Sequence, residues 1–177
     1  MIIGITGTNA SGKDTAADYL KNKGYSHYSL SDIVREECDV RGLPKDRDTL
    51  RELANELRRN FGADVLAKRA IEKIQREKAK NIVITSIRSP EEIKTLKKIL
   101  NLKLIITDAP IELRYERSAK RNRDTIDFKM FKHQEDLELA GGANKQNIKD
   151  AMALADYTII NDGTPEELYE KIEKIII

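Results

Sequence analysis

A glycine-rich stretch near the start of the chain carries the strongest chemical signal in the sequence. Gly7–Lys13 reads Gly-Thr-Asn-Ala-Ser-Gly-Lys and matches G-x-x-x-x-G-K, between a strand-like run and a helical run that starts at Thr15. Glycines let the backbone curl so that successive N–H groups point at phosphate oxygens, and the following helix adds its positive end. This context argues against a glycine-rich turn with an incidental lysine. The predicted nucleotide-binding residues are Gly7, Thr8, Asn9, Ala10, Ser11, Gly12, Lys13, Asp14 and Thr15.

The residue after Lys13 departs from the usual pattern of such loops. A Ser or Thr that ligates Mg²⁺ commonly stands there, and this chain has Asp14, followed by the hydroxyl of Thr15. Mg²⁺ prefers oxygen ligands and keeps several waters, so a carboxylate at this place would bind it directly or through water. The negative charge is tolerable only where the metal or Lys13 offsets it. We expect Asp14 and Thr15 to form the metal side of the site.

Two further basic positions and one acid have the types that phosphate transfer needs. Arg88 follows the end of a predicted strand, and Arg35 lies on a predicted helix that starts at Ser31 and Asp32. The planar fork of arginine binds two phosphate oxygens at once, whereas an aspartate can orient an acceptor hydroxyl. The competing interpretations are a surface salt bridge of Arg35 with an adjacent glutamate and simple N-capping by Asp32.

The densest basic stretch lies in the second half of the chain. Its members fall roughly on one helical face and are Arg114, Arg117, Lys120, Arg121 and Arg123. One interpretation is a lid that stabilises charge on the transferring phosphoryl group. The other is a solvated face paired with neighbouring acids, namely Glu112, Glu116 and Asp124.

Short apolar runs and longer amphipathic runs alternate along the chain and would position these residues. The predicted strands are Ile2–Thr6, Tyr25–Tyr28, Ile82–Thr85, Leu102–Thr107 and Tyr157–Ile160. They are apolar on both faces, as buried parallel strands are. Two helices start at a hydroxyl residue followed by Pro, Glu and Glu, at Ser89 and Thr164, which predicts capping boxes. The alternation predicts an α/β fold with ligands at the carboxyl ends of the strands.

The length fits one domain with two helical insertions. A chain of 177 residues corresponds to a single domain, which we expect to span 1–177. Long helical stretches follow the second and fourth predicted strands. We expect the first, within 31–80, to bind the acceptor and the second, within 112–140, to form a lid.

Charge balance and scarce aromatic residues exclude several classes of protein. The 32 Lys and Arg stand against 30 Asp and Glu, for a net charge of +2, and 5% of the residues are aromatic. Nucleic-acid binders usually show a basic excess or stacking aromatics, so a nucleic-acid partner is not expected. No apolar run approaches about 18 residues, no basic leader precedes the first strand, and Cys38 is the single cysteine. We expect a cytoplasmic protein without a membrane segment and with a small-molecule partner.

The strand ends disfavour a hydrolytic motor. Motors of the AAA+ or helicase type need a hydrophobic run that ends in Asp-Glu. The third predicted strand ends Ile84-Thr85-Ser86, and the fourth ends in Asp108 followed by Ala109. Without the glutamate that activates water, a kinase, which must exclude water, fits better.

Beyond the phosphate loop, further segments occur in a recognisable order. They are Ser31–Arg35, Ser86–Glu91, Asp108–Pro110, and Ala155–Tyr157 leading to Asn161–Gly163. With the loop, this order resembles the P-loop nucleotide kinases around adenylate kinase and dephospho-CoA kinase over nearly the whole chain. It resembles most the archaeal adenylate-kinase-related, dephospho-CoA-kinase-like proteins. The resemblance implies a three-layer P-loop NTPase fold, a five-stranded parallel sheet of order 2-3-1-4-5, and ATP and Mg²⁺ as cofactors.

The resemblance also implies roles on the acceptor side. Asp32 matches an aspartate near the acceptor hydroxyl, and Arg35 and Arg88 match arginines directed at the acceptor phosphate. The third strand of these kinases usually ends in an acid that holds the Mg²⁺ water shell, and Thr85 and Ser86 stand there in this chain. Our hypothesis is that Asp14 replaces that carboxylate.

On the donor side, the resemblance implies an arginine lid and a base-binding loop. Arg117, Arg121 and Arg123 fall where lid arginines close on the donor phosphates, and Gly163 and Thr164 where the backbone borders the adenine. The residues expected to act on the transferring phosphoryl group are Lys13, Asp32, Arg88, Arg117 and Arg121.

The expected function is transfer of the γ-phosphate of ATP to a small nucleotide-like acceptor, as in a nucleoside monophosphate kinase. Dephospho-CoA kinase is the first alternative, in which Asp32 is essential. The second is a nucleotide-dependent assembly factor or ATPase that acts with a protein or RNA partner, which the missing third-strand acid keeps open.

Overall fold

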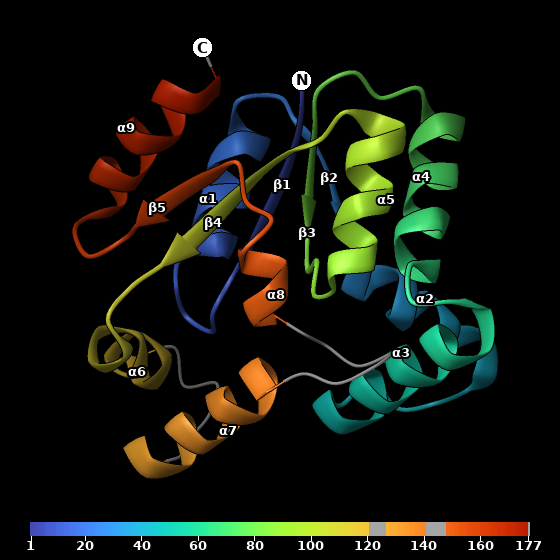
Figure 1. Cartoon of the computed structure of the whole chain (residues 1–177), viewed down its shortest axis with the longest axis horizontal. Coiled ribbons are helices and arrows are strands. Elements are labelled where there is room, and N and C mark those ends of the chain that lie inside the picture. Colours follow the sequence, from blue (N-terminus) through green and yellow to red (C-terminus); the bar gives the residue numbers. More distant parts are fainter. Residues whose placement is uncertain (121–126, 141–147, 177) are drawn as a thin grey trace.

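The sheet at the centre of the molecule has five parallel strands in the order β2-β3-β1-β4-β5. A computed structural model describes residues 1–120, 127–140 and 148–176 (Figure 1). The strands are β1 (Ile2–Gly7), β2 (Ser26–Ser29), β3 (Ile82–Thr85), β4 (Lys103–Asp108) and β5 (Tyr157–Ile160). Each lies within one or two residues of its predicted range. The predicted α/β fold class and the strand order 2-3-1-4-5 are therefore confirmed.

Helices cover both faces of the sheet, which makes three layers (Figure 1). They are α1 (Lys13–Asn22), α2 (Leu30–Arg41), α3 (Arg47–Phe61), α4 (Val65–Glu77), α5 (Pro90–Leu100), α6 (Ile111–Lys120), α7 (Phe128–Ala140), α8 (Ile148–Met152) and α9 (Pro165–Ile176). Helices α1 and α9 bury one face in a core with Ile3, Ile5 and Ile105. On the opposite face α4 and α5 pack against Ile82 and Ile84. Alternate residues of one strand thus enter different cores.

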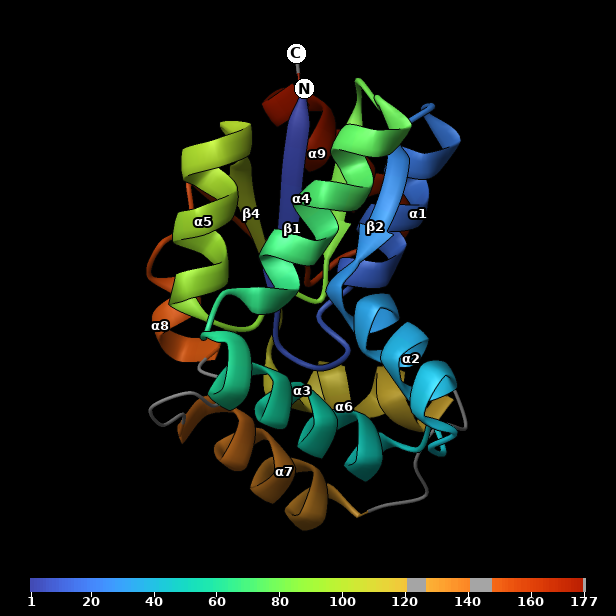
Figure 2. The ribbon, with the colours of Figure 1, turned by 90° about the vertical axis from the view of Figure 1, so that its right-hand side faces the viewer.

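The remaining helices gather at the carboxyl ends of the strands. The strand arrows in Figures 1 and 2 point toward α2, α3, α6 and α7. Helices α2, α3 and α4 follow one another between β2 and β3, and α6, α7 and α8 lie between β4 and β5. The helical stretches expected after the second and fourth strands are therefore present, at the edge where parallel sheets bind ligands.

Local capping signals explain where several helices begin. Ser89 accepts a hydrogen bond from the Glu92 N–H while the Glu92 carboxylate accepts the Ser89 N–H, so the predicted capping box is confirmed. Thr164 and Glu167 form the same reciprocal pair before α9. Helix α2 begins at Leu30, one residue before the predicted start at Ser31, with extended backbone at Ser29.

Across the described ranges, with gaps at 121–126, 141–147 and 177, no helix has both the length and the apolar character needed to cross a bilayer.

Candidate nucleotide-binding site

The loop between β1 and α1 is shaped by close approaches that only glycine permits. A Cβ on Gly7 would lie 2.1 Å from the carbonyl oxygen of Thr107, and one on Gly12 would lie 2.1 Å from Nδ2 of Asn161. Gly12 also has φ of 99°, in the region that disfavours side chains. The loop therefore packs closely against the ends of β4 and β5 before α1 begins at Lys13. A backbone curled in this way can direct several N–H groups at one bound anion.

Side chains from the ends of β4 and β5 hold this loop in place. Ser11 Oγ and Thr107 Oγ1 share a buried hydrogen bond of 2.9 Å. The amide of Asn161 donates to the Ser11 carbonyl at 2.9 Å, and the Thr8 hydroxyl donates to Asp108 Oδ1 at the same distance. No such role was predicted for Thr107, Asp108 or Asn161. Their position just at the carboxyl ends of predicted strands was the available signal.

Lys13 and the two residues after it occupy the first turn of α1. The ammonium of Lys13 is half-buried and donates to the Thr8 carbonyl at 3.0 Å, so it lies across the loop. Asp14 is exposed and Thr15 half-buried at the same helix start. The loop thus brings together a cation, a carboxylate and a hydroxyl beside the positive end of a helix dipole. This combination suits a nucleotide phosphate with a hydrated metal.

Arg114 lies under the loop rather than in an exposed basic stripe. Its guanidinium donates to the carbonyls of Ala109 and Asn9, at 2.7 and 3.3 Å. The same group makes a two-pronged pair with Glu135 of α7, at 2.9 and 2.6 Å, and only 5% of its side chain is exposed. The interpretation of this stretch as a solvated face paired with Glu112 and Glu116 is wrong for Arg114. Arg114 therefore stabilises the backbone of the phosphate loop and of the segment after β4.

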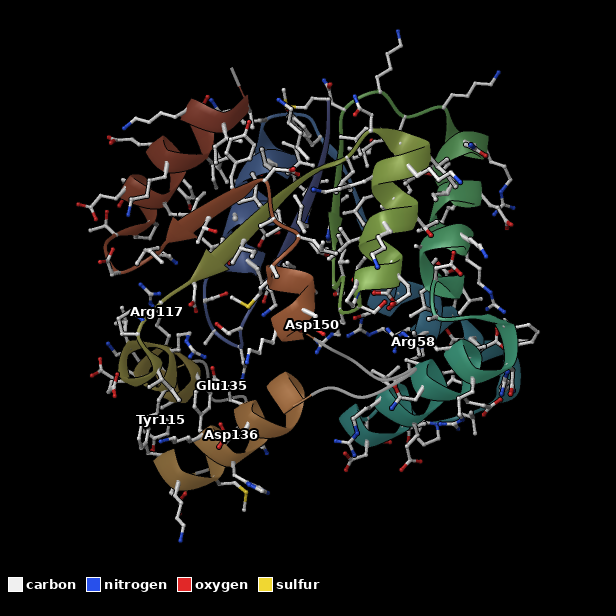
Figure 3. The ribbon with its side chains drawn as sticks, in the orientation of Figure 1. Arg58, Tyr115, Arg117, Glu135, Asp136 and Asp150 are labelled. Atoms are coloured by element: carbon white, nitrogen blue, oxygen red, sulfur yellow. The ribbon has the colours of Figure 1, made fainter. Side chains whose placement is uncertain are left out.

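Arg117 is the arginine of α6 that meets the loop after β5. It donates from Nη1 to the Asn161 carbonyl at 2.8 Å and from Nη2 to the Gly163 carbonyl at 3.2 Å (Figure 3). Arg117, which the resemblance assigns to the donor phosphates, is therefore in contact with Gly163, which it assigns with Thr164 to the donor adenine. Arg121 and Arg123 lie outside the described residues.

On the other side of β1, the proposed acceptor residues follow β2 and β3. Asp32 does not cap α2; its carboxylate accepts from Arg35 Nη1 at 2.8 Å, and both side chains are about half exposed. The nearby glutamates pair elsewhere, Glu36 with Lys73 and Glu37 with Arg69. Arg88 comes three residues after β3 and is half-buried, with its backbone N–H donated to Glu92 Oε2 at 2.8 Å.

Neutral groups occupy the end of β3, where the resembling kinases place an acid. Thr85 Oγ1 shares a hydrogen bond of 2.8 Å with Nε2 of His27, and Ser86 pairs with the Ser29 hydroxyl at 3.0 Å. Burial is the main cause that lowers the pKa of His27, with help from Lys21, while the charges of Asp32, Asp18 and Asp14 act the other way. Asp14 thus lies within electrostatic range of the residue that holds Thr85. Within the described part of the chain, His, Cys, Asp and Glu form no metal-binding group of three or more.

Sequence comparisons identify relatives along almost the whole chain. The sequence family described as "AAA domain" matches residues 3–138, and it is a P-loop domain. The UPF0200 protein of Sulfurisphaera tokodaii is 36% identical over 179 residues, which cover 99% of this chain and 95% of that protein. The UPF0200 protein of Pyrococcus abyssi is 33% identical over 183 residues, with 99% and 95% coverage.

Solved structures with the same fold include kinases. Protein TT1252 from Thermus thermophilus superposes with a TM-score of 0.69 and 19% identity, over 99% of this chain and 96% of that one. Shikimate kinase from Acinetobacter baumannii, in complex with shikimate, gives 0.59 and 17%, over 98% and 91%. At these identities the likeness shows the P-loop kinase fold. The finer resemblance to adenylate or dephospho-CoA kinases stays a prediction.

The loop geometry, the strand order and the full-length relatives agree with one another. The chain belongs to the UPF0200 protein family and carries its P-loop domain on the fold of small kinases.

Proposed function

We propose that the chain is a cytoplasmic ATP-dependent phosphotransferase that moves the γ-phosphate of ATP to a small nucleotide-like acceptor. The observation that carries the proposal is that two cationic side chains follow neighbouring strands at the same edge of the sheet. Lys13 follows β1 in the phosphate loop, and Arg88 follows β3, which pairs directly with β1. Phosphoryl transfer consists largely of positioning two groups and neutralising their charge, so two neighbouring cationic sets suit it.

In this proposal, the loop and the end of β5 bind the donor. The backbone N–H groups from Gly7 to Lys13 hold the phosphates, and Lys13 exchanges its bond to the Thr8 carbonyl for phosphate oxygens. Arg117 borders the donor with Gly163 and Thr164. We assign Arg117 to charge stabilisation on the transferring group as well; the same role for Arg121, which lies outside the described residues, stays a prediction. These arginines belong to a lid within 112–140.

The side-chain oxygens at the start of α1 fit Mg²⁺ as ligands. Asp14 offers an exposed carboxylate and Thr15 a hydroxyl, which is the small oxygen set that Mg²⁺ uses when phosphates and waters complete its shell. When bound, the metal neutralises phosphate charge. We propose that Asp14 takes the place of the acid missing at Thr85. Asp14→Ala should raise the Mg²⁺ concentration needed for half-maximal turnover; unchanged Mg²⁺ dependence contradicts the idea, and retained nucleotide binding shows that the loop is intact.

The acceptor binds, in this proposal, beside α2 and the end of β3, within the helical region 31–80 of one domain that spans 1–177. Asp32 orients the acceptor hydroxyl or phosphate, while Arg35 and Arg88 bind the acceptor phosphate. Asp32 and Arg35 already contact each other. A bound phosphate would compete with Asp32 for the Arg35 guanidinium, since both are anions that take the same fork.

A coupled assay of ADP release tests the proposal. The panel is AMP, CMP, dTMP and dephospho-CoA, each with ATP and Mg²⁺. We expect acceptor-dependent turnover that Lys13→Met reduces by about 100-fold or more. Lys21→Met is the matched control, because Lys21 lies on the same helix in an exposed pair with Asp18. No turnover with any acceptor contradicts the proposal.

The same panel separates the first alternative. A monophosphate acceptor relies on Arg35 and Arg88, so each arginine replaced by Met should raise its KM. If the chain is a dephospho-CoA kinase, turnover with dephospho-CoA instead collapses in Asp32→Asn.

A second candidate, a nucleotide-dependent assembly factor, has one observation in its favour. The "UPF0200/UPF0201 protein" of Archaeoglobus fulgidus is 36% identical over 183 residues, and the match covers 99% of this chain but 55% of that protein. A relative that joins this domain to further chain is consistent with a protein partner. Slow ATP hydrolysis without any acceptor, together with a stable complex with a protein or RNA partner, would favour this function.

A further inference from the structure

A charged residue lies in the core of the acceptor region, on the side of α3 that faces the first turn of α5. Arg58 is 2% exposed, among the buried residues of α3 such as Leu57 (Figure 3). A guanidinium without water needs a full set of partners. Its Nε and Nη2 both donate to Oε1 of Glu92, at 3.2 and 2.8 Å, and Glu92 is completely buried. The pair ties α3 to the first turn of α5.

The second oxygen of the same carboxylate holds the backbone before α5. Glu92 Oε2 accepts the N–H of Ser89 at 3.1 Å and the N–H of Arg88 at 2.8 Å. A capping box by itself needs only the N-cap N–H. The additional bond to Arg88 means that one carboxylate links an α3 guanidinium to the backbone from which the Arg88 side chain projects.

The link continues into α2. Arg41 of α2 donates to Glu56 of α3 at 2.8 Å, two residues before Arg58. Helix α2 also carries Asp32 and Arg35. The two parts of the proposed acceptor site, α2 and the end of β3, are therefore joined through α3 and the Arg58–Glu92 pair.

We propose that Arg58 and Glu92 are positioning residues that set the direction of Arg88 and, through it, the affinity for the acceptor phosphate. The inference rests on the proposed kinase function and names a device within its acceptor site. Neither residue touches a substrate; Glu92 acts on the Arg88 backbone, and Arg58 holds the direction of the Glu92 carboxylate through its two bonds to Oε1. A purely structural pair would leave the balance between donor and acceptor binding unchanged.

The sharpest variant is the double substitution R58M/E92Q. Glutamine at the N3 position still accepts the N–H groups of the cap, and methionine fills the space of the arginine stem without its charge. The helix cap is kept and the tie to α3 is lost. In the folded double variant we expect the KM for the acceptor to rise about tenfold or more, and the KM for ATP to stay within about twofold.

The acceptor is whichever of AMP, CMP, dTMP and dephospho-CoA the wild-type protein phosphorylates. Arg51→Met is the matched control, since Arg51 lies on α3 in an exposed pair with Asp48. It should change neither KM. Wild-type constants in a folded R58M/E92Q protein, or equal rises of both KM values, overturn the proposal.

A second measurement does not depend on catalysis. In Arg58→Met, or in Arg58→Lys where the first fails to fold, amide exchange of the Arg88 N–H should quicken about tenfold relative to Ile5 in β1. Unchanged exchange at Arg88 overturns the positioning role. If the wild-type protein phosphorylates none of the acceptors, the proposed function fails, and the exchange result alone decides this inference.

Discussion

Two buried arginine–glutamate pairs, Arg58–Glu92 and Arg114–Glu135, lie on the acceptor side and on the lid side of the site. They contact the backbone through opposite members: the glutamate in the first pair and the arginine in the second. On the acceptor side, the carboxylate of Glu92 accepts backbone N–H groups through Oε2, and Arg58 donates to its Oε1 without contacting that backbone. On the lid side, Arg114 donates to the backbone carbonyls of Asn9 and Ala109, and Glu135 only anchors it. Each pair thus has one member that shapes the site and one that balances its charge.

The difference shows why a buried ion pair needs to be read with its backbone partners. Such pairs are weak evidence for stability, because desolvation offsets most of the attraction, whereas removal of one partner is strongly destabilising. Glu92 is fully buried and the Glu135 side chain is 10% exposed. An unbalanced charge is therefore worse on the acceptor side than on the lid side.

The largest expected effect is on the acceptor side. Arg58→Met leaves the Glu92 carboxylate buried without its cation, and the free energy of unfolding should fall by about 3–5 kcal/mol. Urea denaturation measures it. A loss no larger than that of Arg51→Met would contradict the importance of the Arg58–Glu92 pair for stability.

On the lid side, the loss should be smaller and the kinetic effect should fall on ATP. Arg114→Met removes the bonds to Asn9 and Ala109, and we expect a loss of about 2–3 kcal/mol with a higher KM for ATP. Glu135→Gln leaves both carbonyl contacts in place and should lose about 1 kcal/mol. If Glu135→Gln is as damaging as Arg114→Met, the anchoring role of Glu135 is understated.

The two pairs share no partner, so their effects should add. In R58M/R114M, the loss of unfolding free energy should equal the sum of the single losses within about 0.5 kcal/mol, measured by a double-mutant cycle in urea. A larger coupling energy would show that the acceptor and lid regions belong to one network, and the two pairs would then not be independent.

Acid should weaken the outer ion pairs of the acceptor region. Hydrogen bonds from Arg69 and then Arg41 hold the pKa of Glu37 below its ordinary value of 4.5. A lowered folded-state pKa gives stability that is complete above the ordinary pKa and is lost as the pH falls through the folded value. Stability should therefore decline below about pH 4.5, and Glu37→Gln should flatten that part of the profile in urea titrations. The same slope in both proteins would assign the decline to other acids.

The smallest effect is expected at the exposed pair on α3. Arg51→Met removes a contact of 2.8 Å to Asp48 in which both side chains are more than half exposed. Such pairs contribute about 0–1 kcal/mol, so the midpoint of thermal unfolding should change very little. A loss comparable with that of Arg58→Met would contradict the distinction between buried and exposed arginines.

Features that depend on near neighbours in the chain were predictable. The loop from Gly7 to Lys13 is recognisable in the sequence because the spaced glycines, the strand and the helix lie next to one another in the chain. The strands followed from apolar runs and the start of α5 from Ser89 and Glu92, since a capping box spans only three residues. The order of the strands came from the family resemblance.

Partners distant in the chain were not predictable. Glu92 was expected as a helix cap, but its second role depends on Arg58, which lies 34 residues earlier. For Arg114 the sequence offered a lid or a face paired with nearby acids, whereas the structure pairs it with Glu135, 21 residues later. Charged side chains are long and many, so spacing alone does not select one partner among them.

The sequence by itself determined the phosphate loop, the α/β alternation and the supply of arginines near strand ends, because these are written in local pattern. The tertiary structure decided which arginines enter the core and which remain at the edge of the sheet. The reason is physical: burial forces a guanidinium to find a carboxylate and carbonyls at fixed distances, and only the packed helices place them there. Arg58 and Arg114 thereby support backbone from within the core, whereas Arg88 and Arg117 lie at the edge of the sheet where we propose that the substrates bind.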